Sequence, residues 1–121
     1  MSESRADVLQ GTLEMLVLTI LSREPTHGWG LSLRLRELSG EVFDVNQGSL
    51  YPALQRMLRR GWLRAEWRAS ENNRRARYYE VTAVGRRQLA AHVAEIASRL
   101  TGVPFEVVPG QTALLRMPRG A

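Results

Sequence analysis

Arginine side chains gather in one part of this sequence, and their chemistry suits the binding of phosphate groups. The chain holds 17 basic residues, all of them arginine, against 12 acids, which gives a net charge of +5. The segment from Arg56 to Arg87 contains ten of these arginines and three acids. An arginine carries a fixed positive charge and a planar fork of donors that matches phosphate oxygens. This one-sided cluster predicts binding to nucleic acid or another polyanion.

A short polar run ahead of an apolar helix offers a second set of groups for nucleic-acid contact. The run reads Asn-Gln-Gly-Ser, and either Asn46 or Ser49 can cap the helix that follows. Ser49 places Pro52 in the first turn, whereas Asn46 places it inside the helix, and the sequence leaves both starts open. In both cases Gln47, Gly48 and Ser49 lie at the amino end, where free N–H groups attract phosphate.

Tyr51 stands near the start of the same helix, on a different face from its apolar residues. Leu50 and Leu54 are predicted to face the core, and Tyr51 is turned about 100° away from Leu50. We therefore expect the phenol of Tyr51 to contact DNA rather than to pack in the core.

The spacing of apolar residues predicts the elements that position these groups. Intervals of three and four residues indicate helices over residues 9–23, over about ten residues that end at Leu38, and from 46 or 49 to 60. From residue 62 apolar residues recur at every second position, which indicates strands over 62–68 and 78–81. The polar loop between the strands contains an Asn pair and two arginines, so the unit is expected to be an antiparallel hairpin with a basic tip.

A last helix is expected from about Ala83 to Leu100, with Thr82 as its N-cap and Gly102 and Pro104 after its end. One face carries apolar residues spaced as in a coiled coil, namely Leu89, Val93, Ile96 and Leu100. A monomer would expose this stripe, so we expect it to join two protomers in a homodimer. The expected organisation is a DNA-binding domain over residues 1–82, a dimerisation helix over 83–101 and a tail of unknown role over 102–121.

Three helices, a hairpin and a further helix follow one another as in a winged helix-turn-helix domain. The expected fold class is therefore mainly α with a small antiparallel β-hairpin, plus a C-terminal dimerisation helix. Several short segments also make the chain resemble the PadR family of bacterial transcriptional regulators. They are Leu9–Leu13, His27–Gly30, Gly48–Leu54, Arg60–Leu63 and Asn73–Thr82, followed by Gly85.

The resemblance implies a homodimeric repressor that binds double-stranded DNA. Its third helix would enter the major groove, its hairpin wing would touch the flanking backbone, and its last helix would pair the protomers. Family members often respond to small aromatic or amphiphilic compounds, so a small-molecule effector is a further expected partner. The last helix of family members usually runs longer than the one expected here, which Gly102 and Pro104 cut short.

The residues expected to contact DNA come from the first helix, the third helix and the wing. They are Gln10, Gly11, Thr12, Asn46, Gln47, Gly48, Ser49, Tyr51, Pro52, Arg56, Asn72, Asn73, Arg74, Arg75 and Arg77. For Gly11 and Thr12 two roles stay open, since they can cap the first helix or hold a phosphate with the N–H groups freed there. Trp29 and Trp67 are candidates for an effector pocket, with packing in the core or an interface as the simpler interpretation.

Other classes of function find little support in the sequence. The chain has no cysteine, no paired carboxylates and no glycine-rich phosphate loop, so neither an enzyme nor a bound cofactor or metal is expected. His27 is interpreted as a turn-fixing hydrogen bonder. With no apolar run of membrane-spanning length and no leader, we expect a cytoplasmic protein that makes no membrane contact. The alternative function is a winged-helix module for protein or RNA, in which Tyr78 and Tyr79 would stack on bases.

Overall fold

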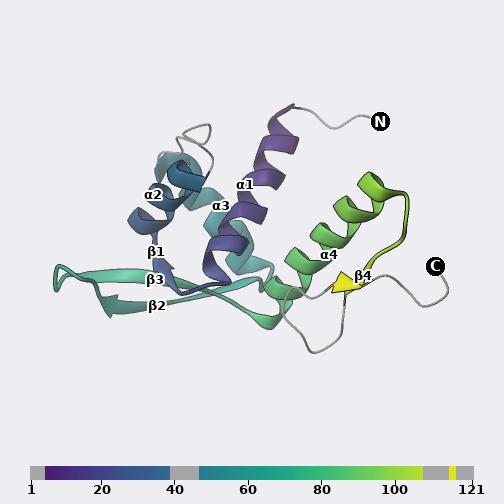
Figure 1. Cartoon of the computed structure of the whole chain (residues 1–121). Coiled ribbons are helices and arrows are strands. Elements are labelled where there is room, and N and C mark those ends of the chain that lie inside the picture. The colour runs from purple at the N-terminus through teal and green to yellow at the C-terminus, as the bar shows by residue number, and fades with distance from the viewer. Residues whose placement is uncertain (1–4, 39–46, 108–114, 117–121) are drawn as a thin grey trace.

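The computed structural model describes residues 5–38, 47–107 and 115–116 (Figure 1). The elements in chain order are α1 (Arg5–Leu21), β1 (Thr26–His27), α2 (Gly28–Leu38), α3 (Gln47–Arg59), β2 (Leu63–Ala69), β3 (Arg75–Val81), α4 (Ala83–Thr101), β4 (Glu106–Val107) and β5 (Leu115–Arg116). The expected fold class, mainly α with a small antiparallel sheet, is confirmed.

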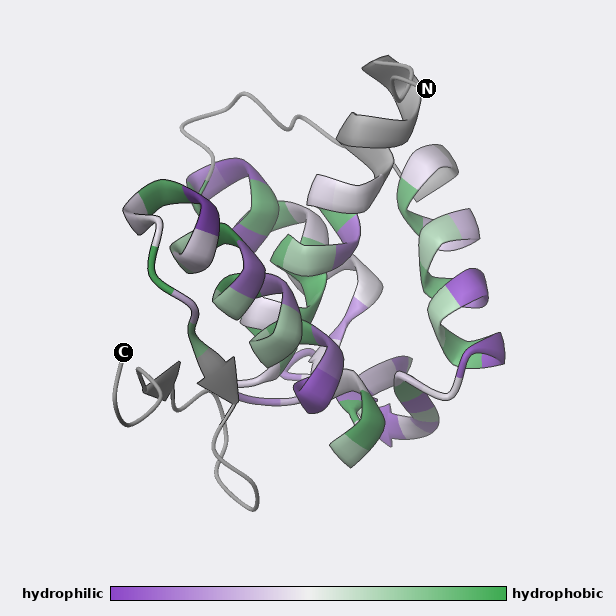
Figure 2. Cartoon of the chain, turned by 90° about the vertical axis from the view of Figure 1, so that its right-hand side faces the viewer, coloured by the Kyte–Doolittle hydropathy of each residue, from purple (hydrophilic) through white to green (hydrophobic). Residues whose placement is uncertain are grey.

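The core lies where α1, α2 and α3 meet the sheet. Side chains of Val17, Leu31, Leu50 and Leu54 are fully buried there, together with Met57. Figure 2 shows the apolar segments of these helices turned toward one another, with polar segments outside. Helical spacing in the sequence predicted this because residues three and four apart lie on one face.

The sheet connects the helical core to a projecting hairpin. Its strand order is β1-β3-β2, and all neighbours are antiparallel. Leu63 pairs with Val81 at the core end, and Ala69 pairs with Arg75 near the tip. In Figure 1 the hairpin of β2 and β3 extends beyond the helices, so its end projects as a wing.

Several elements differ from the sequence-based prediction. Helix α1 runs from Arg5 to Leu21 instead of from residue 9 to 23. Helix α3 begins at Gln47, so Pro52 lies inside it and the start after Ser49 is wrong. Asn46, the other candidate cap, lies outside the described residues. Strand β1 was not predicted, because two residues are too few for a periodic pattern and only pairing with β3 defines it.

The junction between β2 and α4 is built around the carbonyl group of Trp62. Thr82 donates its backbone N–H to that oxygen at 2.9 Å, and its side-chain oxygen accepts from the N–H of Gly85 at 3.1 Å. Thr82 is thus the N-cap of α4, as predicted. A Cβ atom on Gly85 would lie 2.3 Å from the same carbonyl oxygen. Only glycine allows α4 to start this close to β2.

The chain turns back at the end of α4. Gly102 takes a left-handed conformation with φ of 72°, and its N–H donates to the carbonyl of Ser98 at 2.9 Å. The N–H of Phe105 then donates to the hydroxyl of Ser98 at 3.0 Å. Strand β4 follows and pairs with β5. Within the described part of the chain, none of the helices is long and apolar enough to cross a bilayer.

Replacing Gly85 with alanine should destabilise the fold, because a methyl group would press on the Trp62 carbonyl. We expect Gly85→Ala to lower the free energy of unfolding by about 1 to 3 kcal/mol, as overpacking usually does. Urea denaturation followed by circular dichroism measures the change. Gly11→Ala is the matched control, since a Cβ on Gly11 has no neighbour within 4 Å and alanine favours a helix. Equal effects of the two substitutions would contradict the close contact.

Candidate nucleic-acid interface

Helix α3 presents a polar face opposite its buried one. Leu50 and Leu54 are fully buried, whereas Tyr51 is 42% exposed and Pro52 and Gln55 are exposed. The predicted orientation of Tyr51 relative to Leu50 is confirmed. Gln55 follows Tyr51 by one helical turn on the same face, a spacing that could have identified it from the sequence. Ser49 is exposed in the first turn, where Gln47 and Gly48 also lie.

The wing carries three exposed arginines at its end. Arg74, Arg75 and Arg77 are exposed, and within the described ranges none of the three forms an ion pair. Asn73 takes a left-handed conformation with φ of 58°, and its N–H donates to the carbonyl of Ser70 at 2.9 Å. Asn73 therefore shapes the turn, as asparagine often does. Its exposed neighbour Asn72 and the three arginines form the solvent-facing tip.

Other arginines of the cluster are paired with acids of the same hairpin. Arg64 donates two hydrogen bonds to its cross-strand neighbour Glu80, at 3.2 and 3.1 Å. These bonds from Arg64 lower the pKa of the Glu80 carboxyl. Arg68 pairs with Glu66 and lies 4.0 Å from Glu80. Acids are few in this segment, but their positions leave the uncompensated charge at the wing tip rather than along the whole hairpin.

Arg56 has a partner within the chain that the sequence analysis did not predict. Its Nε lies 3.5 Å from a carboxylate oxygen of Glu14 on α1, and Arg60 donates to both oxygens of that carboxylate at 3.1 and 3.0 Å. Glu14 is only 5% exposed, and a buried carboxylate needs such compensation. Arg56 thus ties α3 to α1, and its predicted contact with DNA stays a prediction. A lone acid inside a largely apolar helix was the sequence signal for this pair.

The two roles predicted for Gly11 and Thr12 are corrected. Gly11 and Thr12 lie in the middle of α1, which begins at Arg5, so they neither cap this helix nor offer freed N–H groups. Gln10 precedes them within the same helix. Any contact of this segment with DNA would have to come from side chains.

Trp29 and Trp67 are both 60% exposed, and they line one hollow. This space of about 460 Å³, here called the wing hollow, lies between the start of α2, the exposed face of α3 and the wing. Its other polar or aromatic walls include Tyr51, Gln55, Arg75, Arg77 and Tyr79. The exposed face of α3 and the arginines of β3 are therefore neighbours.

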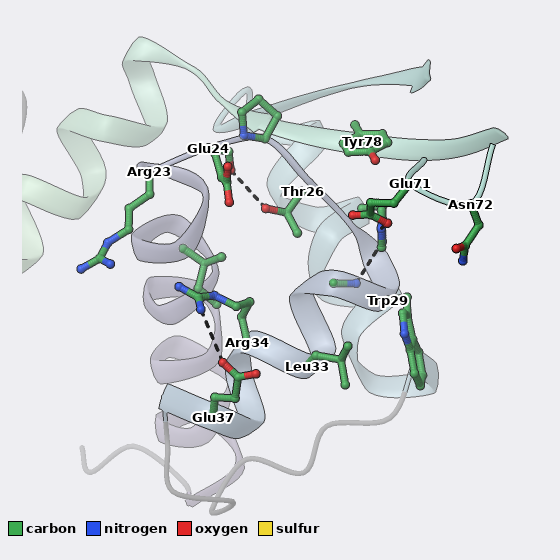
Figure 3. Close-up of a pocket in the computed structure, with 14 residues that line it drawn as sticks. Arg23, Glu24, Thr26, Trp29, Leu33, Arg34, Glu37, Glu71, Asn72 and Tyr78 are labelled. Carbon is green, nitrogen blue, oxygen red and sulfur yellow. Dashed lines mark hydrogen bonds and ion pairs between the residues drawn. The ribbon is translucent and has the colours of Figure 1, made fainter. Parts of the chain in front are cut away.

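A second, larger space of about 540 Å³ lies between α1, α2 and the wing loop and is called the helix hollow here. Trp29 lines it but Trp67 does not, and its apolar walls include Leu33 and Tyr78. Figure 3 shows Glu24, Glu37 and Glu71 around this space, with Arg34 paired to Glu37. The two hollows thus share one tryptophan and differ in charge.

His27 fixes the turn into α2, as predicted. Its Nδ1 accepts the N–H of Gly30 at 3.0 Å, and its ring meets Tyr78 edge to face at 5.2 Å. Its Nε2 lies 3.7 Å from a carboxylate oxygen of Glu71 on the wing loop. These contacts hold the wing against α2. A group of three side chains able to hold a metal ion does not occur among the described residues.

The apolar seam on α4 is partly exposed. Val93 and Ile96 are exposed, and Leu100 is 82% exposed. Leu89, however, is only 8% exposed and packs in the core of its own chain, so its assignment to the dimer seam is corrected. Burial follows from its place two turns into α4, where the helix still lies against the core. Val84 is an exposed apolar residue of the same helix that the sequence analysis did not identify.

A three-helix core with a projecting hairpin, an exposed third-helix face and a basic wing tip defines a winged-helix protein of the DNA-binding type. A sequence model described as the transcriptional regulator PadR-like family matches residues 17–91. The chain belongs to this family.

Solved structures and a curated relative agree with this assignment. A PadR-like transcription factor from Bacteroides fragilis is 26% identical, with 81% of this chain and 92% of that chain covered and a TM-score of 0.71. A PadR-like transcriptional regulator from Bacillus cereus is 30% identical, with 79% and 93% covered and a TM-score of 0.66. An uncharacterised protein of Lysinibacillus sphaericus is 23% identical over 77% of this chain and 85% of that protein.

Removing the buried carboxylate should loosen α3. We expect Glu14→Ala to cost about 1 to 2 kcal/mol of unfolding free energy, since the guanidinium groups left behind are partly exposed and can turn to water. Urea denaturation measures this. Glu95→Ala is the control, because the exposed pair of Glu95 with Arg99 is worth at most about 0.5 kcal/mol. A loss no larger than that of the control would show that the buried pair does not hold α3.

Proposed function

We propose that this PadR-like transcriptional regulator represses transcription as a homodimer on a palindromic operator. Family membership makes the chain a DNA-binding transcriptional regulator. One observation carries the finer proposal: the exposed face of α3 and the uncompensated arginines of β3 adjoin each other across the wing hollow. A helix in the major groove with a basic wing on the flanking backbone is the docking geometry that such a surface fits.

Side chains at the start of α3 would read base edges in this arrangement. Gln47, Ser49 and Tyr51 offer short or planar polar groups there, and each well-placed contact to a base is worth about 1 to 3 kcal/mol of discrimination. Arg74, Arg75 and Arg77 would meet phosphates or the minor groove, which stabilises any duplex.

The homodimer would form through the exposed part of the α4 seam. Val93, Ile96 and Leu100 supply its apolar side chains. A two-fold dimer would place two α3 helices in successive major grooves, with half-site centres about 34 Å apart.

We further propose that a small aromatic ligand releases the protein from its operator. The helix hollow supports it, because Trp29, Leu33 and Tyr78 give it aromatic and apolar walls and its size suits a small molecule. A ligand there would touch Glu71 and Asn72 of the wing loop and could displace the wing tip.

The alternative module for protein or RNA has less support. Tyr79 is buried, and Arg68 covers the ring of Tyr78 at 5.4 Å, so the pair does not form an open stacking platform. A gel shift with duplex and single-stranded competitors separates the two functions. Competition by single strands at equal concentration would favour the RNA-binding alternative.

Substitutions in α3 and in the wing should affect DNA binding in different ways. We expect Gln47→Ala or Tyr51→Ala to weaken binding to an operator selected from a random duplex library, and to leave binding to a random duplex nearly unchanged. Gel shifts on both duplexes measure this. Arg34→Ala serves as control, because Arg34 lies on the helix hollow and outside the wing hollow. Equal losses on both duplexes would refute α3 as the reading element.

The double variant Arg74→Ala with Arg75→Ala should weaken both duplexes to a similar extent. Because each neutralised phosphate releases counterions, about eight phosphate contacts give a slope near −7 for log K against log[salt]. The variant should flatten this slope by about one for each phosphate that is no longer neutralised. Titrations between low and moderate salt measure it. A wild-type slope flatter than about −2 would refute the electrostatic role of the arginines.

Charges on the seam should separate the protomers. We expect Val93→Glu with Ile96→Glu to yield a folded monomer at tens of micromolar, since both side chains are exposed in one protomer. Sedimentation velocity measures the oligomeric state, and circular dichroism checks folding. A dimer unchanged by both substitutions would place the contact elsewhere on the protein.

A further inference from the structure

The wing hollow differs in charge from its neighbour. Arg75 and Arg77 line it, and its described lining residues include no acid, whereas three glutamates and two arginines line the helix hollow. The guanidinium of Arg75 lies 5.7 Å from the centre of the Trp67 ring, and that of Arg77 lies 5.8 Å from the centre of the Tyr79 ring. Both cations are therefore held over aromatic faces at the wall of an acid-free space, which suits an anionic occupant.

The two indole rings of this hollow are unusually open to solvent. Trp29 and Trp67 come from different elements, α2 and β2, and both keep most of their surface exposed. Large exposed aromatic side chains that face one space mark a contact surface. Each ring also offers an indole N–H, which is a donor without acceptor capacity. The occupant should therefore combine apolar surface with acceptor oxygens.

The position of the hollow selects among occupants with that chemistry. Tyr51 and Gln55 of α3 form one side of it, and strand β3 of the wing forms the other. A helix that lies in the major groove is flanked by the sugar–phosphate backbone, because the backbone forms the walls of the groove. A deoxyribose ring is apolar, and its phosphates are anionic acceptors.

We propose that the wing hollow seats the sugar–phosphate backbone of one operator strand. Trp29 and Trp67 pack on deoxyribose rings and donate their indole N–H groups to phosphate oxygens, and Arg75 and Arg77 neutralise those phosphates. This inference rests on the proposed role of α3 as the reading helix. It assigns Trp67 to DNA positioning rather than to an effector pocket, and it leaves the helix hollow as the effector site.

Contacts with the sugar–phosphate backbone carry no sequence information, so their loss should be recognisable by its equal effect on the affinity for different duplexes. Loss of Trp67 should weaken every duplex by the same factor. Loss of a base-reading residue of α3 should instead weaken the operator alone.

The test uses the full chain with Trp62 replaced by phenylalanine, so that Trp29 and Trp67 are the two remaining indoles. Titration with a random duplex of about three helical turns should quench their fluorescence. Trp67→Ala should reduce affinity for this duplex and for a selected operator by roughly tenfold each, the effect of removing one favourable interaction. Trp67→Phe, which keeps the ring face and removes the N–H, should have a smaller effect. Leu38→Ala is the matched control, because Leu38 is an exposed apolar residue of α2 that lines neither hollow, so both affinities should stay unchanged.

A chemical variant of the DNA locates the contact. Neutral methylphosphonates placed singly along the operator should weaken wild-type binding at the seated phosphates. At those positions the same methylphosphonates should have little further effect on DNA binding by the double variant Arg75→Ala with Arg77→Ala. Because Trp67 is exposed, its variants should fold, and circular dichroism verifies this.

Three results would overturn the proposal. Unchanged affinity of Trp67→Ala for both duplexes would show that DNA does not reach the hollow. A loss confined to the operator would indicate a base contact instead. Quenching of both indoles by micromolar 2-naphthalenesulfonate, with displacement of the random duplex, would make the hollow an effector site. An equal loss of affinity for both duplexes in Trp67→Ala would support the proposal even if Tyr51→Ala showed no selectivity. The reading role of α3 can therefore be refuted separately.

Discussion

The buried carboxylate of Glu14 is the constraint on which the geometry of this protein depends. A charge inside a small core is tolerated only with close partners, and Arg56 and Arg60 of α3 supply them. Helix α3 is thereby fixed in rotation as well as position, since Leu50 and Leu54 must point inward at the same time. Tyr51 and Gln55 consequently face outward toward the wing. Arg60 also stacks on Trp62 at 4.9 Å, which connects the pair to the start of the hairpin.

Short-range contacts hold the wing at two places. Strand β1 adds two residues to the sheet and brings His27 to Tyr78 and Glu71, while the junction of Trp62, Thr82 and Gly85 fastens the other end to α4. The hairpin is therefore held at its base by this junction and near its tip through His27 and Glu71, and its unpaired arginines lie at the distal end. Charge compensation within the hairpin, above all between Arg64 and Glu80, confines the uncompensated cations to that end.

The sequence predicted whatever depends on local periodicity. The four helices, the hairpin, the cap at Thr82 and the outward face of Tyr51 all follow from spacing or from single-residue preferences, and the structure confirms them. What was missed depends on pairs far apart in the chain. Glu14 meets its arginines across 42 and 46 positions, and β1 exists only through β3. Leu89 fits a heptad seam by spacing, but only the packing of α4 on the core shows that it is buried.

The end of α4 has a consequence for how the protein would respond to its own abundance. The helix stops at Gly102, and the chain then folds back onto Ser98, so the exposed seam covers barely two turns of helix. A pair of protomers joined over so little apolar surface would dissociate at low concentration, and occupancy of a two-fold site would then rise with the square of protomer concentration. In the proposed homodimer, regulation would therefore depend more steeply on expression than in a protein whose longer helix keeps the protomers paired.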